Sequence, residues 1–261
     1  TLDASNYRPV VLLAKLFKAV ERALLKRVNR AVMNSGGLHS TNLAYQKGKG
    51  REMALFVLIG SILHRKFNWP NSSTFICLLD VQHAYNGVNL HKLGLDLWER
   101  GVRGKVWKLI MEMILNLVYT VRVNGRSSWS FEGAGVPQGA TLSPKQFIIF
   151  KDGLAWALQE CGAPGVGVTL ENGGVIVGAF WSDDDAILAE TEEGMRTALK
   201  EVAEFSASKR VRYHGMTKGK EGKVMDFGSQ MGQKRWFKMG KLRVKEVDEG
   251  LFLGRIMAKP N

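Results

Sequence analysis

The chain has 261 residues, of which 45% are hydrophobic, and this is enough to bury the core of one large domain or of two small ones. A composition this apolar excludes a disordered chain. Lys and Arg number 37 against 24 Asp and Glu, so the net charge of +13 predicts a polyanionic partner, with nucleic acid ahead of an acidic membrane surface.

The sequence shows no sign of export or of a membrane span. No apolar run approaches the roughly 18 to 20 residues that cross a bilayer, and the first residues contain no signal-peptide hydrophobic region. Cys77 and Cys161 are too few for a disulfide framework, which favours a reducing compartment and two core positions. We therefore expect an intracellular protein, in the nucleus or cytoplasm of a host cell, that is not secreted. Because the chain lacks an initial Met and stops soon after residues 251–254, we also expect a piece of a longer polypeptide.

Two helices and a basic loop are predicted near the N-terminus. Apolar residues recur at helical spacing over 10–33, with Lys and Arg largely on the other faces, which predicts a basic amphipathic helix. The loop 45–51 carries three positive charges spaced by glycines, and it suits either phosphate binding or a solvated turn. A second helix is expected over 51–67, with an apolar face formed by Met53, Phe56, Val57, Ile59 and Leu63.

The middle of the chain contains an apolar run that ends in an acid. Residues 74–80 are apolar up to Asp80, as in a strand that is buried on both faces. The elements expected after it are helical segments over 90–98 and 105–117, a strand over 119–124, a Gly- and Pro-rich loop over 135–144 and a helix over 147–158.

Three consecutive acids lie between two apolar runs, 175–181 and 186–189, which predicts a tight hairpin with carboxylates at its tip. Adjacent carboxylates repel one another unless a cation lies on them, so Asp183 and Asp184 indicate a divalent metal site. A solvated acidic turn is the alternative that this stretch alone leaves open. The elements expected beyond it are a helix with Thr191 as its N-cap, a strand over 224–227 and a hairpin over 236–247.

Asp80 and the pair Asp183–Asp184 supply three carboxylates that a small antiparallel sheet could bring to one spot. Two Mg²⁺ ions about 3.5 to 4 Å apart would let one ion activate a 3′-hydroxyl while the other stabilises the leaving pyrophosphate. Oxygen ligands suit such a hard cation, and Mn²⁺ is an alternative ion.

In chain order, these motifs resemble those of the reverse transcriptase family, most closely its branch of non-LTR (LINE-like) retrotransposons. Residues 6–9 with Lys18 and Glu21 are similar to the opening fingers motif, and residues 45–51 to the glycine-arginine fingertip loop. Asp80–Tyr85 is similar to the first carboxylate motif, and Trp181–Asp184 is similar to the aromatic-x-Asp-Asp hairpin. Gly135–Gly139 with Leu142–Pro144 is similar to the nucleotide- and template-positioning loop. Leu251–Gly254 is similar to the start of the primer grip. Five or six such motifs in the right order cover nearly the whole chain and are very specific.

The resemblance implies an α+β right-hand polymerase fold, with fingers and a ferredoxin-like palm built on an antiparallel sheet, and with the thumb missing. Residues 1–261 would form one reverse transcriptase domain with interleaved parts, roughly 1–70 fingers and 71–261 mostly palm. The implied activity is RNA-directed DNA polymerisation, which adds dNTPs to a DNA or RNA primer on an RNA template, within a retrotransposon polyprotein. No motif implies an oligomeric state or a membrane partner.

The same resemblance implies roles for individual residues. The metals would be held by Asp80, Asp183, Asp184 and Val81. The incoming nucleotide would be bound by Lys47, Lys49, Arg51, Tyr85, Gln138 and Gly139, with the Tyr85 ring as a steric gate against a 2′-hydroxyl. Nucleic acid would be bound by Arg8, Lys18, Arg27, Pro137, Lys218, Lys223, Leu253 and Gly254.

Some residues depart from the family pattern. They are Trp181 in place of Tyr or Phe, Ser182 in place of Ala, Asp185 as a third acid, Asn86 in place of Asp and His214 in place of Asn. Because successive strand residues face opposite sides, we expect Asp185 to point away from Asp184, with its charge still near the metals. The lysine that protonates pyrophosphate is left open among Lys218, Lys220 and Lys223.

Three other functions are compatible with these motifs. The first is a decayed, catalytically inactive scaffold that keeps the fold and binds RNA, although a scaffold does not need all three carboxylates. The second is a group II intron-type reverse transcriptase or maturase. The third is an RNA-directed RNA polymerase, which shares the Asp-Asp hairpin but is disfavoured by Tyr85 and the loop 137–139.

Overall fold

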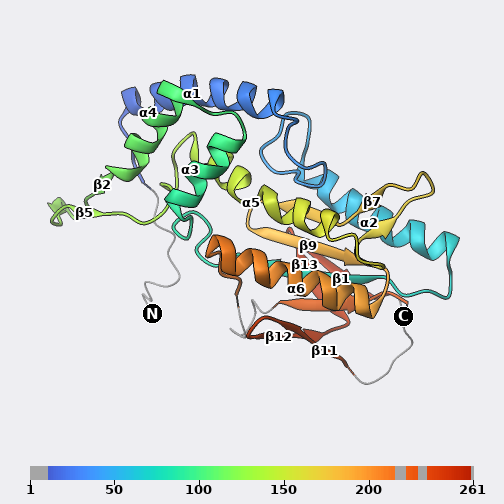
Figure 1. Ribbon diagram of the computed structural model, residues 1–261. Helices are drawn as coiled ribbons and strands as arrows, with labels where there is room; N and C mark the ends of the chain where they lie inside the picture. Colours follow the sequence, from blue (N-terminus) through green and yellow to red (C-terminus); the bar gives the residue numbers. More distant parts are fainter. Residues whose placement is uncertain (1–10, 215–221, 229–233, 260–261) are drawn as a thin grey trace. The chain divides into compact units, whose positions relative to one another are not determined.

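The computed structural model describes residues 11–214, 222–228 and 234–259, and it contains both helices and sheet strands (Figure 1). The chain folds into two compact units. The first unit combines the residues up to Leu38 with His83–Phe150, and the second combines His39–Gln82 with the residues from Lys151 onward. Within the described ranges, no helix is long and apolar enough to cross a membrane.

A six-stranded sheet forms the centre of the second unit (Figure 1). Its strand order is β11-β12-β10-β1-β9-β8, and all neighbours are antiparallel except β10 and β12. The strands are β1 (Phe75–Asp80), β8 (Gly178–Trp181), β9 (Asp184–Ala189), β10 (Lys223–Asp226), β11 (Trp236–Met239) and β12 (Leu242–Glu246). Two hairpins complete the strands of this unit: β6 (Val168–Thr169) with β7 (Val175–Ile176), and β13 (Glu249–Phe252) with β14 (Arg255–Ala258).

Strand β1 is central because it is apolar on both faces. Ile76 and Leu78 belong to a core that includes Ala54 and Leu58 of helix α2 (Arg51–Asn68). The neighbouring residue Phe75 is also buried, and its ring lies edge-on to a second phenylalanine of the sheet, with the centroids 6.2 Å apart. The predicted strand, buried on both faces and ending in Asp80, is therefore confirmed.

Helix α6 (Glu192–Lys209) packs against β1, β9 and β11. The Thr191 hydroxyl accepts a hydrogen bond from the Gly194 N–H at 2.9 Å and so caps the first turn. Two glutamates in that turn add negative charge at the positive end of the helix dipole. The predicted N-cap and helix are confirmed.

Helix α2 agrees with the prediction in its bounds but not in its buried face. The side chains of Met53, Phe56, Ile59 and Leu63 are exposed, whereas Ala54, Leu58, Ser61 and Arg65 are buried. The helix lies against β8, and Ala54 and Leu58 join the core that includes Ala179 of that strand. Of the predicted face, Val57 is partly buried and packs against the core, so the prediction is wrong for the other four residues.

The first unit is mainly helical. Its helices are α1 (Lys15–Asn34), α3 (Leu90–Glu99), α4 (Gly104–Leu115) and the first residues of α5 (Ser143–Glu160). Two short hairpins pair β2 (Val118–Tyr119) with β5 (Phe131–Glu132), and β3 (Arg122–Val123) with β4 (Arg126–Ser127). Helix α1 begins at Lys15 rather than at residue 10, and Leu16 and Val20 of its expected apolar face are exposed. The buried face of α1 holds Glu21, Leu24, Val28 and Val32.

Three further predictions need correction. The strand expected over 119–124 is divided between β2 and β3, and the chain turns at Asn124–Gly125, where φ is +48° and +79°. Helix α5 begins at Ser143, earlier than predicted. Cys77 is buried as expected, but Cys161 is only half-buried, at the end of α5, where it is less enclosed than a core residue.

Candidate active site

The backbone of the second unit brings three carboxylates together. Strand β1 ends at Asp80 and strand β9 begins at Asp184, and these two residues are direct partners in the antiparallel ladder. The carbonyl of Asp183 accepts a hydrogen bond at 3.0 Å from the N–H of Val81, the residue that follows β1. Asp80, Asp183 and Asp184 therefore lie at the adjoining ends of two neighbouring strands.

The tip of the acidic hairpin is shorter than predicted. Strand β8 pairs with β9 up to Trp181 opposite Asp184, so only Ser182 and Asp183 form the turn. Ser182 has φ +56°, a left-handed conformation that non-glycine residues adopt infrequently. Asp184 and Asp185 lie in β9 and point to opposite faces, since Asp184 is half-buried whereas Asp185 is 1% exposed. The prediction that the side chains of Asp184 and Asp185 point to opposite faces of the sheet is confirmed.

Negative charge accumulates at this edge of the sheet. Burial raises the pKa of Asp184 to about 6, and the charges of Asp183, Asp80 and Asp185 add to the rise. Carboxylate oxygens such as these are ligands that a hard divalent cation fits. Among the described residues, no three His, Cys, Asp or Glu side chains already converge as a metal-binding group.

The raised pKa of Asp184 predicts a pH-dependent stability of the metal-free protein. The pKa of Asp184 is higher in the folded protein than its ordinary value of 3.8, so the folded protein loses stability as the pH rises from 3.8 to about 6. Above the folded pKa this loss of unfolding free energy is complete. The substitution Asp184→Asn removes this pH-dependent loss of stability. Allowing for partial exposure, the variant should be about 1 to 2 kcal/mol more stable than wild type near pH 7.5, and equally stable near pH 3.5. Urea unfolding at both pH values measures the difference, and a difference that is the same at both would contradict the prediction.

A buried charged cluster lies behind the acids, and its lysine and tyrosine belong to none of the motifs that the sequence shows. Lys151 of α5 donates to a carboxylate oxygen of Asp185 at 2.6 Å, and the Tyr213 hydroxyl donates to the other oxygen at 3.0 Å. Burial raises the pKa of Asp185, and the Lys151 ammonium opposes that rise. The available sequence signal was a lysine within the apolar stretch that runs from Phe147 to Leu158.

The segment after α6 returns to Asp80. The N–H of His214 donates to the Asp80 carbonyl at 2.9 Å, and the His214 Nε2 atom lies 3.9 Å from an Asp80 carboxylate oxygen. Lys223 is half-buried at the start of β10. Lys218, Lys220 and Arg8 lie outside the described residues. The two-residue turn Leu253–Gly254, with φ +52° and +75°, joins β13 to β14.

The basic loop 45–51 also belongs to the second unit. The Tyr45 hydroxyl lies 3.3 Å from the Ser182 hydroxyl of the acidic hairpin. Lys49 donates to the Ser40 carbonyl at 3.2 Å, and burial lowers its pKa. Lys47 and Arg51 are exposed. The loop therefore presents two exposed cations, Lys47 and Arg51, whereas the Lys49 ammonium group is hydrogen-bonded to the backbone.

The remaining nucleotide-binding candidates belong to the first unit. The Tyr85 carbonyl accepts from the Val136 N–H at 3.0 Å, and a side chain at Gly135 would meet that carbonyl at 2.1 Å. Glycine is therefore required at 135, where φ is +67°. The half-buried Tyr85 ring lies 5.3 Å from the ring of Phe147. Pro137 is buried, Gln138 accepts a backbone hydrogen bond from Val11, and Gly139 has φ +107°.

Helix α1 and the loop before α5 are joined within the first unit. The buried Glu21 carboxylate accepts hydrogen bonds from the N–H groups of Thr141 and Leu142 at 2.9 and 3.4 Å. Lys18 is half-buried and Arg27 is exposed on the same helix. The glutamate thus anchors the loop 135–144 to the basic helix.

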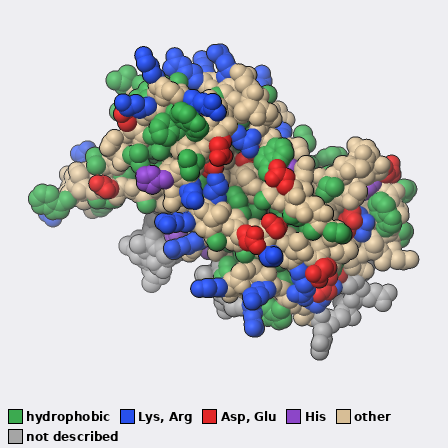
Figure 2. Space-filling model, viewed as in Figure 1, with side chains coloured by type: hydrophobic (Ala, Val, Ile, Leu, Met, Phe, Trp, Pro, Cys, Tyr) green, Lys and Arg blue, Asp and Glu red, His purple; other side chains and the backbone are tan. Residues whose placement is uncertain are grey.

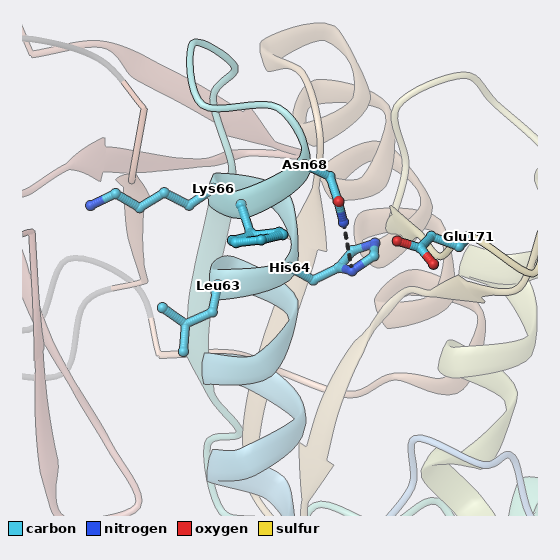
Figure 3. Close-up of a pocket in the computed structure, with 6 residues that line it drawn as sticks. Leu63, His64, Lys66, Asn68 and Glu171 are labelled. Carbon is cyan, nitrogen blue, oxygen red and sulfur yellow. Dashed lines mark hydrogen bonds between the residues drawn. The ribbon is translucent and has the colours of Figure 1, made fainter.

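One depression in the second unit is separate from the acids. It has a volume of about 590 Å³ and lies at the end of α2, where His64 receives a hydrogen bond from Asn68 at 3.1 Å. The Glu171 carboxylate points toward the His64 ring (Figure 3). Its lining includes none of the predicted site residues. Its one acid and one histidine form no catalytic set, so the chemistry is better placed at the β1–β9 edge.

Solved structures define the class of protein. The chain is similar to an apo telomerase of Candida tropicalis truncated from its C-terminal domain, with a TM-score of 0.52, 12% identity, and coverage of 94% of this chain and 45% of that one. It is also similar to a telomerase of Candida albicans in complex with a TWJ fragment of telomeric RNA, with a TM-score of 0.54, 11% identity, and coverage of 87% and 36%. The chain therefore has the right-hand polymerase fold, and the predicted mixed α and β class is confirmed.

Sequence comparison defines the family. The family described as "Reverse transcriptase (RNA-dependent DNA polymerase)" matches residues 3–216, and this chain belongs to it. The RNA-directed DNA polymerase from the mobile element jockey of Drosophila funebris is 27% identical over 201 residues, which cover 73% of this chain and 20% of that protein. The Pol polyprotein from the type-1 retrotransposable element R2 of Popillia japonica is 29% identical over 207 residues, which cover 78% and 28%. The resemblance to the non-LTR branch is confirmed, and the chain spans about a quarter of the length of these relatives.

Proposed function

We propose that this chain is the catalytic core of an RNA-directed DNA polymerase, which adds dNTPs to the 3′-hydroxyl of a primer on an RNA template. The observation that carries the proposal is the meeting of Asp80, Asp183 and Asp184 at one edge of the sheet in a right-hand polymerase fold. Extension of a DNA or RNA primer on an RNA template, with dNTPs and a divalent metal ion, tests it. A folded wild-type protein that extends neither primer would contradict it.

We assign the metal site to these three carboxylates together with the Val81 carbonyl. Members of the family generally use divalent metal ions, and we propose two Mg²⁺ ions, with Mn²⁺ as a substitute. Bound ions would activate the primer 3′-hydroxyl and stabilise the leaving pyrophosphate. The protein's part is to fix the carboxylates at adjoining strand ends, so that little reorganisation is needed during the reaction.

The proposed nucleotide contacts come from two loops. Lys47, Lys49 and Arg51 would neutralise the triphosphate, and the two exposed cations among them are accessible for this role. Gln138 and the Gly139 backbone would contact the nucleotide, and the Tyr85 ring would exclude a ribose 2′-hydroxyl. We further propose that residues 1–70 form mainly fingers and residues 71–261 mainly palm, with the parts interleaved.

The proposed contacts to primer and template lie on several segments. They are Arg8, Lys18, Arg27, Pro137, Lys218, Lys223, Leu253 and Gly254. Basic side chains gather over α1, as Figure 2 shows. In the first unit, Arg27 and Arg30 of α1 line a depression of about 510 Å³ together with Arg103, which lies just before α4. Among the described residues, no acidic side chain lines this depression, so phosphate groups of RNA suit it.

Removal of two of these arginines is expected to weaken RNA binding in a salt-dependent way. Arg27→Ala/Arg30→Ala should lower the salt slope of the binding constant by about 1 to 2 and raise Kd by roughly 10-fold or more at moderate salt, because two phosphate contacts are lost. Lys105→Ala/Lys108→Ala removes the same charge from α4 outside the depression and serves as the control. Fluorescence anisotropy at several salt concentrations measures both effects, and equal losses in the two variants would show that only net charge matters.

A further inference from the structure

Lys151 makes contacts on both sides of the two hairpin aspartates. Its ammonium group donates to the Ser182 carbonyl at 2.8 Å, immediately before Asp183. It also donates to the Asp185 carboxylate at 2.6 Å, immediately after Asp184. Lys151 is 5% exposed, so both bonds are shielded from water. One side chain on α5 thus spans the segment that carries both proposed metal ligands of the hairpin.

The contacts continue to the strand that carries Asp80. The Tyr213 hydroxyl donates to the second carboxylate oxygen of Asp185, and Tyr213 is 4% exposed. Its backbone forms an antiparallel bridge with Val81, and the residue after it, His214, donates to the Asp80 carbonyl. Both carboxylate oxygens of Asp185 are therefore bonded, one to the helix and one to the segment beside Asp80.

The energetics show why this cluster acts as a unit. A buried lysine or aspartate without a partner is strongly destabilising, whereas a buried pair that is fully hydrogen-bonded can be tolerated. The turn at Ser182 has a left-handed φ, which persists only where surrounding contacts hold it. The bond from Lys151 to the Ser182 carbonyl is such a contact, and it fixes the peptide that orients Asp183.

We propose that Lys151, acting through Asp185 and the Ser182 carbonyl, is a positioning residue that holds Asp183 and Asp184 in the geometry for nucleotidyl transfer. Tyr213 completes the arrangement by tying Asp185 to the segment next to Asp80. This proposal rests on the proposed polymerase function, since it concerns the same three carboxylates. It adds a second layer of residues to the site, which lies behind the acids rather than in contact with the substrates.

Primer extension by Lys151→Met tests the proposal. We expect kcat to fall by about 10- to 100-fold with little change in the KM for dNTP, because the contacts to the nucleotide are made by other loops. Tyr213→Phe removes one hydrogen bond without changing charge, and its kcat should fall by about 3- to 10-fold. A KM rise with an unchanged kcat in both variants would overturn the proposal.

Arg235→Met is the matched control. Arg235 bonds to Glu246 at 2.7 Å and to Glu192 at 3.1 Å in another ion-pair network of the same unit. Within the described ranges, Arg235 forms no hydrogen bond or ion pair with the acidic hairpin. Its removal should lower the thermal midpoint while leaving kcat per folded molecule unchanged. If Lys151→Met and Arg235→Met lower kcat per folded molecule equally, the role of Lys151 is structural and the proposal fails.

Hydrogen–deuterium exchange provides a measurement that does not depend on activity. Amides of residues 182–185 should exchange at least about 10-fold faster in Lys151→Met than in wild type, and at the wild-type rate in Arg235→Met. If Lys151→Met fails to fold, Lys151→Met/Asp185→Leu removes both buried charges, and its hairpin should still exchange fast after the thermal midpoint recovers. Wild-type exchange in the double variant would overturn the proposal. If wild type makes no DNA, the polymerase function fails, but the exchange result still decides whether Lys151 positions the hairpin.

Discussion

Asp183→Asn and Asp80→Asn are each expected to lower primer extension by at least about 1000-fold, or roughly 4 kcal/mol of transition-state stabilisation. Asparagine keeps the volume of the side chain but removes the charge on which the proposed metal site depends. Both residues lie at adjoining strand ends, so either loss disrupts the same site. Single-turnover extension on an RNA template measures the effect.

The fold and RNA affinity should survive these substitutions, because each one removes repulsion among like charges. Asp248→Asn makes the same chemical change in an exposed ion pair with Lys234 and Lys259, and it should leave extension unchanged. An Asp183→Asn variant with near-wild-type extension would remove Asp183 from the metal site. A wild-type protein that binds RNA but never extends a primer would instead favour the inactive scaffold.

Tyr85→Ala is expected to reduce the preference for dNTP over NTP by about 10- to 200-fold, or ~1 to 3 kcal/mol. In the proposed role of a steric gate, loss of the ring opens space for a 2′-hydroxyl. The Tyr85 backbone is held by Val136, so the position of residue 85 should persist without its ring. Use of dNTPs should fall only modestly, since the substitution removes packing of the ring, including that against Phe147, rather than a proposed metal ligand.

The alternative is that Tyr85 is only a packing residue beside Phe147. In that case Tyr85→Ala would lower dNTP and NTP use together and leave their ratio unchanged. Tyr85→Phe is the matched control, because it keeps the ring and should keep the preference. Parallel kinetics with dNTP and NTP on one RNA template decide between the two roles, and an unchanged ratio in folded Tyr85→Ala would exclude the steric gate.

The sequence alone was sufficient to predict the structural features that depend on short segments of the chain. A short run of apolar residues ending in Asp80 favours a buried strand. The Thr191 hydroxyl with two following glutamates favours a helix start wherever that helix packs. The ordered motifs also identified the family, because each depends on neighbours within a few residues. These features are local, so tertiary contacts did not change them.

Tertiary structure decided which side chains meet and which surfaces are buried. Lys151 and Asp185 are 34 residues apart in sequence, and only the packing of α5 against the hairpin makes them a pair. The buried face of α2 was likewise decided by its contact with β8, which accepts Ala54 and Leu58 and leaves Phe56 in solvent. Periodicity shows that a helix has an apolar stripe, but burial depends on the shape of the partner surface, which distant residues provide.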